Sequence, residues 1–105
     1  MDYKSKIRDG LEEALKSDPE ILGKKQLVFF EDKEVDWSQK ERRDVEVYLE
    51  DGYCSGSYHV HICGTRFVAM VSYAVDKYLR TKLKGALISC SGTVEEDVIL
   101  ITITE

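Results

Sequence analysis

Apolar and polar residues alternate along two segments in the middle of the chain, and this alternation predicts a β-hairpin. Residues 44–50 carry apolar side chains at Val45, Val47 and Leu49. After a turn-like segment at 51–56, residues 57–63 carry them at Tyr58, Val60 and Ile62. Because successive side chains of a strand point to opposite faces, each strand is expected to bury one set and expose the other.

The register of this hairpin follows from matching the two apolar sets, with Leu49 facing Tyr58. The pairs that result are Val47 with Val60, Val45 with Ile62, His61 with Glu46, and Cys63 with Asp44. Residues that face each other across two strands contact each other and stabilise the pairing.

The segments on either side of the hairpin predict two amphipathic helices. Residues 3–16 carry apolar side chains at helical spacing, and residues 65–84 do so with a wider apolar face. Thr65 is a suitable cap for the second helix, and Gly85 is a suitable end. The Asp18-Pro19 pair is a typical helix start, so a further short helical turn is expected there.

The remaining apolar runs predict three more strands, at residues 26–30, 86–91 and 98–104. The inward residues of the last strand are expected to be Ile99, Ile101 and Ile103. Residues 92–97 are expected to turn the chain. The charged connection at 31–43 contains Trp37 and is long for a hairpin loop, which makes it a candidate for use in function.

These elements predict an α+β fold with the order α-β-β-β-α-β-β. Short connections favour antiparallel neighbours, so we expect a five-stranded, mostly antiparallel sheet with two helices packed on one face. A length of 105 residues predicts a single domain over residues 1–105. If Leu27, Phe29, Val98 and Leu100 lie on the other face, that face is partly apolar, which suggests a second surface covering it.

Composition narrows the classes of protein that the chain can represent. The formal net charge is −5, which argues against a dedicated nucleic-acid binder, because such proteins present a basic surface. Three cysteines are few, and odd in number, for a secreted disulfide scaffold, so we expect a cytoplasmic location. No apolar run is long enough to cross a membrane, and no signal peptide is expected.

The second hairpin strand carries a cluster of side chains that could bind a metal, His59, His61 and Cys63, with Glu46 on the neighbouring strand. Imidazole, thiolate and carboxylate groups are the usual ligands of zinc and other transition metals. Side chains two positions apart on a strand lie roughly 6.5–7 Å apart, so a site would need a ligand from another strand. A metal-binding or pH-responsive protein is therefore the alternative hypothesis, and otherwise no cofactor is expected.

A third hypothesis is a thiol enzyme that uses Cys63 as its nucleophile. Cys63 precedes the second helix, whose dipole would lower the pKa of the thiol. Catalysis also needs a base within hydrogen-bond reach and a group that orients it, and the spacing provides neither. We expect Cys54 to be exposed in its turn and Cys90 to be buried with the core. The chain is therefore expected not to be an enzyme.

The order helix, three strands, helix is also that of a double-stranded RNA-binding domain. That family reads RNA with basic residues at the start of its second helix. The corresponding segment here, 64–67, contains a single basic residue, Arg66. RNA is therefore not expected as a partner, and the chain has no glycine-rich phosphate-binding motif.

The segment 11–23, LEEALKSDPEILG, resembles the opening of small bacteriophage tail-completion and tail-terminator proteins. Those families pair a short helix that ends in such a turn with a sheet, a second helix and a final hairpin. The resemblance implies an oligomeric ring at the end of a tail tube, without catalysis. It covers this segment and the order of the elements, it assigns no site residue, and it offers no role for the strand that contains the histidines.

The leading hypothesis is a small non-enzymatic interaction or assembly module that associates with itself or with another protein. The strands carry more apolar side chains than one helix-covered face can use, and aromatic residues anchor interfaces more often than charged ones. The expected contact residues are Phe29, Trp37, Tyr48 and Leu100. A phage or mobile-element origin, in virion assembly or inhibition of a host protein, would suit such a domain.

Overall fold

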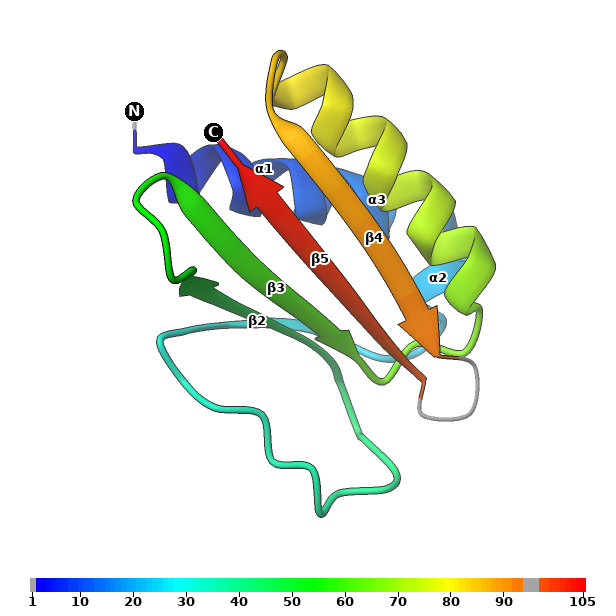
Figure 1. Cartoon of the computed structure of the whole chain (residues 1–105). Helices are drawn as coiled ribbons and strands as arrows, with labels where there is room; N and C mark the ends of the chain where they lie inside the picture. The colour runs from blue at the N-terminus through cyan, green and yellow to red at the C-terminus, as the bar shows by residue number, and fades with distance from the viewer. Residues whose placement is uncertain (1, 94–96) are drawn as a thin grey trace.

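The alternating segments form one five-stranded sheet with the strand order β1-β2-β3-β5-β4 (Figure 1). The computed structural model describes residues 2–93 and 97–105. The strands are β1 Leu27–Glu31, β2 Val45–Asp51, β3 Ser57–Cys63, β4 Leu87–Thr93 and β5 Val98–Thr104. β1 and β2 are parallel, whereas β2–β3, β3–β5 and β4–β5 are antiparallel. The predicted α+β class and mostly antiparallel sheet are confirmed.

Two long helices cover one face of this sheet, as predicted. They are α1, Tyr3–Lys16, and α3, Val68–Lys82, and the short α2, Pro19–Leu22, follows α1. The Asp18 carboxylate caps α2 by accepting a hydrogen bond from Glu20 N at 2.9 Å. The short helix predicted to start at Asp18-Pro19 is therefore confirmed.

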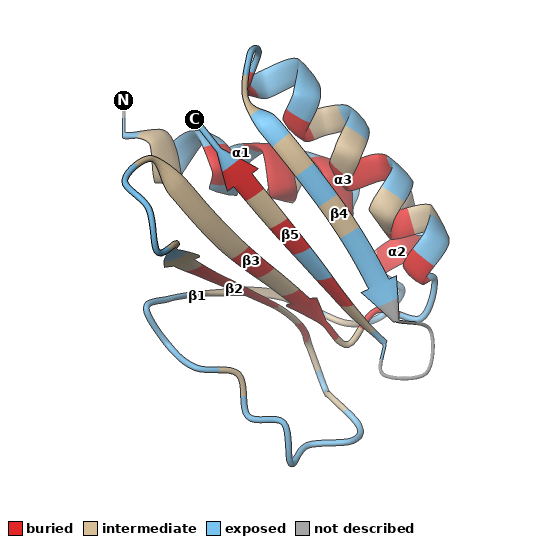
Figure 2. Ribbon diagram, viewed as in Figure 1, coloured by how far each residue is buried: buried red, intermediate tan, exposed pale blue. Residues whose placement is uncertain are grey.

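The hydrophobic core lies between the two long helices and the sheet face that they cover (Figure 2). Fully buried strand residues include Val45, Val47, Val60, Ile62, Ile99, Ile101 and Ile103, so the inward sets predicted for these strands are confirmed. The helices approach each other closely at Gly10, where an added Cβ would lie 2.9 Å from Leu79 Cδ2. Glycine thus allows the contact between α1 and α3 at the cost of helix propensity.

The long connection between β1 and β2 is a crossover, because parallel neighbours cannot be joined by a tight turn. It contains the residues between Glu31 and Val45 and begins at Asp32, whose φ of +54° is a left-handed conformation that Asp tolerates. We call residues 32–44 the crossover. It runs over the sheet face opposite the helices, which we call the open face.

The hairpin of β2 and β3 has the predicted faces but not the predicted register. Leu49 lies opposite Val60 rather than Tyr58, and Asp51 lies opposite Tyr58, so the pairing is shifted by two residues. The cause is a tighter turn, in which the N–H of Gly52 donates to Ser57 O at 2.8 Å and extends the ladder to the turn. A shift of two residues keeps every side chain on its predicted face.

The start of α3 also differs from the prediction. The helix begins at Val68, its N-cap is Phe67, and no side chain caps it. Thr65 is 1% exposed, and its hydroxyl has no hydrogen-bond partner among the residues that the structure describes. Gly64, with a φ of +89°, turns the chain between β3 and Thr65, and this turn carries Thr65 away from the capping position.

The predicted turn at 92–97 lies in part outside the described residues, which omit 94–96. Among the described helices, none has the length and apolar character needed to cross a membrane.

Replacing Gly64 should destabilise the fold more than replacing Gly85. Both glycines have nearly the same left-handed φ, +89° and +88°, but a Cβ on Gly64 would lie 2.5 Å from Asp44 O, whereas nothing lies within 4 Å of one on Gly85. We expect Gly85→Ala to lower the free energy of unfolding by about 1–2 kcal/mol from backbone strain. Gly64→Ala should lower it further. Urea unfolding of the two variants measures the difference, and equal losses would contradict the close contact.

Candidate functional site

A row of side chains crosses the open face from one strand to the next. The strand registers place Phe30, Tyr48, His61, Leu100 and Ser91 next to one another in this order. The Phe30 and Tyr48 rings are stacked with their centroids 4.9 Å apart. Tyr48 is 6% exposed and Leu100 is 37% exposed, so the row is covered at its β2 side and open at its β5 side.

Trp37 of the crossover lies over this row. Its ring meets His61 edge-on, with the centroids 5.7 Å apart, while 58% of the residue stays exposed. Burial lowers the pKa of His61 from its ordinary value, because the charged imidazolium would lose water. Three of the four predicted contact residues, Trp37, Tyr48 and Leu100, therefore gather around His61.

Phe29, the fourth predicted contact residue, lies on the opposite side of the sheet. It is paired with Val47 in the parallel register and packs against the helix-covered core. The Arg8 guanidinium lies over its ring, 4.7 Å from the centroid. The expected surface of Phe29, Trp37 and Tyr48 does not form, because adjacent positions of β1 point to opposite faces.

Arg42 attaches the crossover to the open face. Its guanidinium donates to the Glu46 carboxylate and also to Asp36 O at 2.6 Å, and its side chain is only 6% exposed. The Asp36 carboxylate in turn accepts hydrogen bonds from the N–H of Ser38 at 3.0 Å and its hydroxyl at 2.6 Å. These bonds order the middle of the crossover and hold Trp37 near the sheet.

Glu46 also binds the hydroxyl of Tyr48, which donates to the carboxylate at 2.8 Å. Burial, followed by this hydrogen bond and the charge of Glu46, raises the pKa of Tyr48 to about 12. Arg42, Glu46 and Tyr48 thus form one network that joins the crossover to β2, and we call it the latch.

The residues of the metal hypothesis do not converge on one point. His59 lies opposite Glu50, with 4.0 Å between Nδ1 and the carboxylate, and its ring contacts Tyr53. His61 faces Tyr48 rather than Glu46, and Cys63 faces Glu46. Among residues 2–93 and 97–105, no three His, Cys, Asp or Glu side chains are grouped closely enough to hold a metal ion.

The cysteines are arranged in a way that does not favour thiol chemistry. Cys63 is fully buried, and burial raises the pKa of its thiol instead of the helix dipole lowering it. Cys90 packs against the core but is only partly buried, and this burial raises the pKa of its thiol to about 11. Cys54 is exposed in its turn, as expected.

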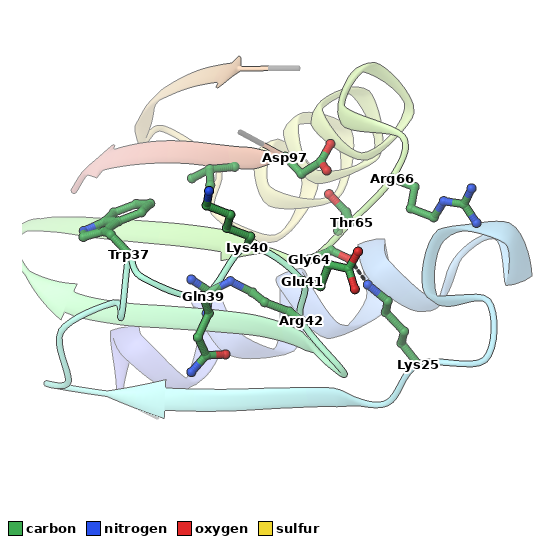
Figure 3. Close-up of a pocket in the computed structure, with 11 residues that line it drawn as sticks. Lys25, Trp37, Gln39, Lys40, Glu41, Arg42, Gly64, Thr65, Arg66 and Asp97 are labelled. Carbon is green, nitrogen blue, oxygen red and sulfur yellow. Dashed lines mark hydrogen bonds between the residues drawn. The ribbon is translucent and has the colours of Figure 1, made fainter. Parts of the chain in front are cut away.

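A cavity of about 910 Å³ opens between the crossover, the end of β3 and the start of β5 (Figure 3). Its lining includes basic residues and two carboxylates, namely Lys25, Lys40, Arg42, Arg66, Glu41 and Asp97, together with Trp37 at one side. The Lys25 ammonium donates to Gly64 O at 2.8 Å, and the Arg66 side chain extends away from Gly64. Charges of both signs line the cavity, so its geometry selects no single class of ligand.

The sequence did not predict this cavity, because four separate segments of the chain form it, at Lys25, 37–42, 64–66 and 97–98. In the sequence, only Gly64, directly before Thr65, could have indicated an unusual turn beside the cavity.

Comparisons of the chain with protein-family models, with curated proteins and with solved structures find no match in any of the three. The function is therefore inferred from the geometry alone.

Breaking the latch should destabilise the protein strongly. Arg42→Ala leaves the half-buried Glu46 carboxylate without its cation and Asp36 O without its donor, so we expect a loss of about 3 kcal/mol or more in the free energy of unfolding. Arg42→Ala combined with Glu46→Ala should lose less than the sum of the single variants. Lys16→Ala, which breaks an exposed ion pair with Glu12, is the control and should lose about 1 kcal/mol or less. Additive losses in denaturant unfolding would contradict the coupling.

The raised pKa of Tyr48 predicts a loss of stability in alkali. Because the folded-state pKa lies above the ordinary value of 10, the stabilisation is fully present below pH 10 and is lost as the pH rises towards about 12. Tyr48→Phe should therefore show a shallower fall in melting temperature than the wild type over this window. Tyr53→Phe, which removes a fully exposed hydroxyl, is the control. Identical slopes for Tyr48→Phe and the wild type would contradict the assignment.

Proposed function

We propose that the chain is a non-enzymatic interaction module that associates with copies of itself through β4 and β5, the strands whose open-face side chains the crossover leaves uncovered. We call these open-face side chains the uncharged patch. Its residues are Leu87, Ser89, Ser91, Val98, Leu100, Thr102 and Thr104. The observation that carries the proposal is the lack of charge in both strands.

Charged residues are common in the chain but absent from this part of the sheet. Of 105 residues, 15 are Lys or Arg and 20 are Asp or Glu, yet Leu87–Thr93 and Val98–Thr104 contain none. Two apolar side chains in the patch, Leu87 and Leu100, are 73% and 37% exposed. Exposed apolar side chains on a neutral surface are typical of interaction sites.

The charge of the whole chain limits where a second copy could make contact. Each copy carries a net charge of −5, so two copies repel each other wherever their acidic surfaces approach. Contact through the uncharged patch avoids placing like charges opposite each other at short range. A two-fold contact also requires a surface that matches itself, and short neutral side chains such as Ser89, Ser91 and Thr102 meet this condition.

The surroundings of the reactive side chains support a role without catalysis. Burial raises the pKa of the thiols of Cys63 and Cys90, which makes both poor nucleophiles at neutral pH. The two histidines have separate neighbours, Glu50 for His59 and Trp37 for His61. An assembly role needs none of these groups to react.

A charge in the uncharged patch should weaken self-association. We expect the wild type to sediment at twice the 12.0 kDa mass of one chain at high concentration, and Leu87→Asp, on β4, to raise the dissociation constant by about tenfold or more. Tyr73→Asp is the matched control, because Tyr73 is a large exposed side chain on α3, outside the patch. A wild type that stays monomeric, or a Tyr73→Asp variant that dissociates as Leu87→Asp does, would refute the proposal.

A further inference from the structure

We infer that two copies join through β4, each strand lying antiparallel beside the β4 of the other copy so that the two sheets become one. The inference rests on the proposed function, since it specifies how the chain meets its second copy. Five strands in each copy would give a continuous sheet of ten strands across a two-fold axis. Three observations support β4 as the joining strand.

The first observation is that β4 lies at an edge of the sheet. It pairs with β5 on one side, and on the other side no strand of residues 2–93 and 97–105 lies beside it. Its outer side therefore presents backbone N–H and C=O groups that a second strand can bind. Figure 2 shows β4 as largely exposed along its length, in contrast to β5 beside it.

The second observation is that β4 itself contains none of the residues that keep an edge strand from pairing; the cation beside it, Arg80, comes from α3. The strand contains no charged residue and no proline, and its register with β5 runs without a bulge from Leu87 opposite Thr104 to Thr93 opposite Val98. Charges, prolines and bulges are the usual means by which monomeric proteins protect such edges. A straight, neutral edge of seven residues is suited to pairing with another strand.

The opposite edge, β1, is shorter than β4 and has cations over both of its faces. It has five residues and ends in the charged Glu31. The Lys33 ammonium lies 4.6 Å from the Phe30 ring centroid, and Arg8 covers Phe29 on the other face. A strand that approached β1 would meet cations on both faces of the sheet. Self-association through this edge is therefore disfavoured relative to β4.

The third observation is the direction of the free backbone groups of β4. Arg80 Nη2 donates to Ile88 O at 3.3 Å from α3, so this carbonyl points away from β5. In an antiparallel pair the N–H and C=O of every second residue point the same way, so those of Cys90 and Gly92 also point outward. Ile88 O can keep its bond to Arg80 and accept a second one, because a carbonyl oxygen has two lone pairs.

Two copies of β4 complement each other when they run antiparallel. Each provides outward N–H and C=O groups at alternate residues, which is the pattern that the other copy needs. The side chains that would lie near the joint on the open face are short and neutral, as in Ser89 and Ser91. A strand from an unrelated partner would form the same hydrogen bonds. Its position would not, however, be set by the two-fold symmetry that relates two uncharged patches.

Residue-resolved amide exchange of the full chain tests this geometry. The amides of Leu87, Ser89 and Ser91 bind β5 and should be protected at every protein concentration. Those of Ile88, Cys90 and Gly92 should gain about tenfold or more in protection as the concentration rises through the association range. This alternating pattern is expected only if a strand binds the edge, because stacking of the open faces would leave the outward amides unbonded.

A pair of variants at the same positions provides the control. Ser89→Lys with Ser91→Lys places like charges across the joint and should abolish both the association and the gain in protection. Ser89→Thr with Ser91→Thr keeps the edge neutral and should retain both. Circular dichroism and the amide protection of β5 establish that each variant is folded.

The outcomes separate this inference from the proposed function. A dimer in sedimentation without concentration-dependent protection at residues 88, 90 and 92 overturns the role of β4 and leaves self-association standing. A chain that is monomeric at every concentration overturns both. Association that persists in the doubly lysine-substituted variant also refutes the pairing through β4.

Discussion

The arrangement of the open face depends on the buried guanidinium of Arg42. A parallel pair of strands at one side of the sheet requires a long crossover, and a polar crossover has little apolar surface with which to bind the sheet. Arg42 compensates by bonding to Glu46 on β2 and to the backbone of Asp36 at once. Because the Arg42 and Glu46 side chains are largely buried, their charge-assisted bond anchors the segment to β2.

This attachment divides the open face into two unlike halves. Over β2 and β3, the crossover brings Trp37 against His61 and keeps Tyr48 away from water. Over β4 and β5, the face is bare and neutral, with Leu100 at the boundary between the halves. The same segment forms one wall of the cavity beside Gly64. A single structural requirement, the crossover, therefore determines which part of the open face is covered and which is left bare.

Most of the fold could be predicted from local patterns in the sequence. The alternation of β2, β3 and β5 identified the buried side of each strand, and the Asp18-Pro19 pair located α2, because these signals depend only on neighbouring residues. The register of the hairpin could not be predicted in the same way. It depends on the hydrogen bonds of the turn around Gly52, and a shift of two residues leaves the burial pattern unchanged.

The candidate site was less predictable, since it depends on which strands become neighbours. Phe29 was grouped with Trp37 and Tyr48 by residue type, but the parallel pairing of β1 places it on the helix side. The length of the crossover was a usable signal for that pairing, because a hairpin would not need it. Nothing in the sequence indicated that His59 and His61 would have different neighbours or that Thr65 would be buried.

The position of β5 has a consequence for how the chain folds as it is synthesised. β5 is the last strand in the sequence, yet it lies between β3 and β4 and binds both along their full length. A nascent chain that has exposed the other four strands still lacks the strand that joins them. Until β5 emerges, β3 has an open edge and β4 has no partner, so the period before its arrival is when a chaperone would be most useful.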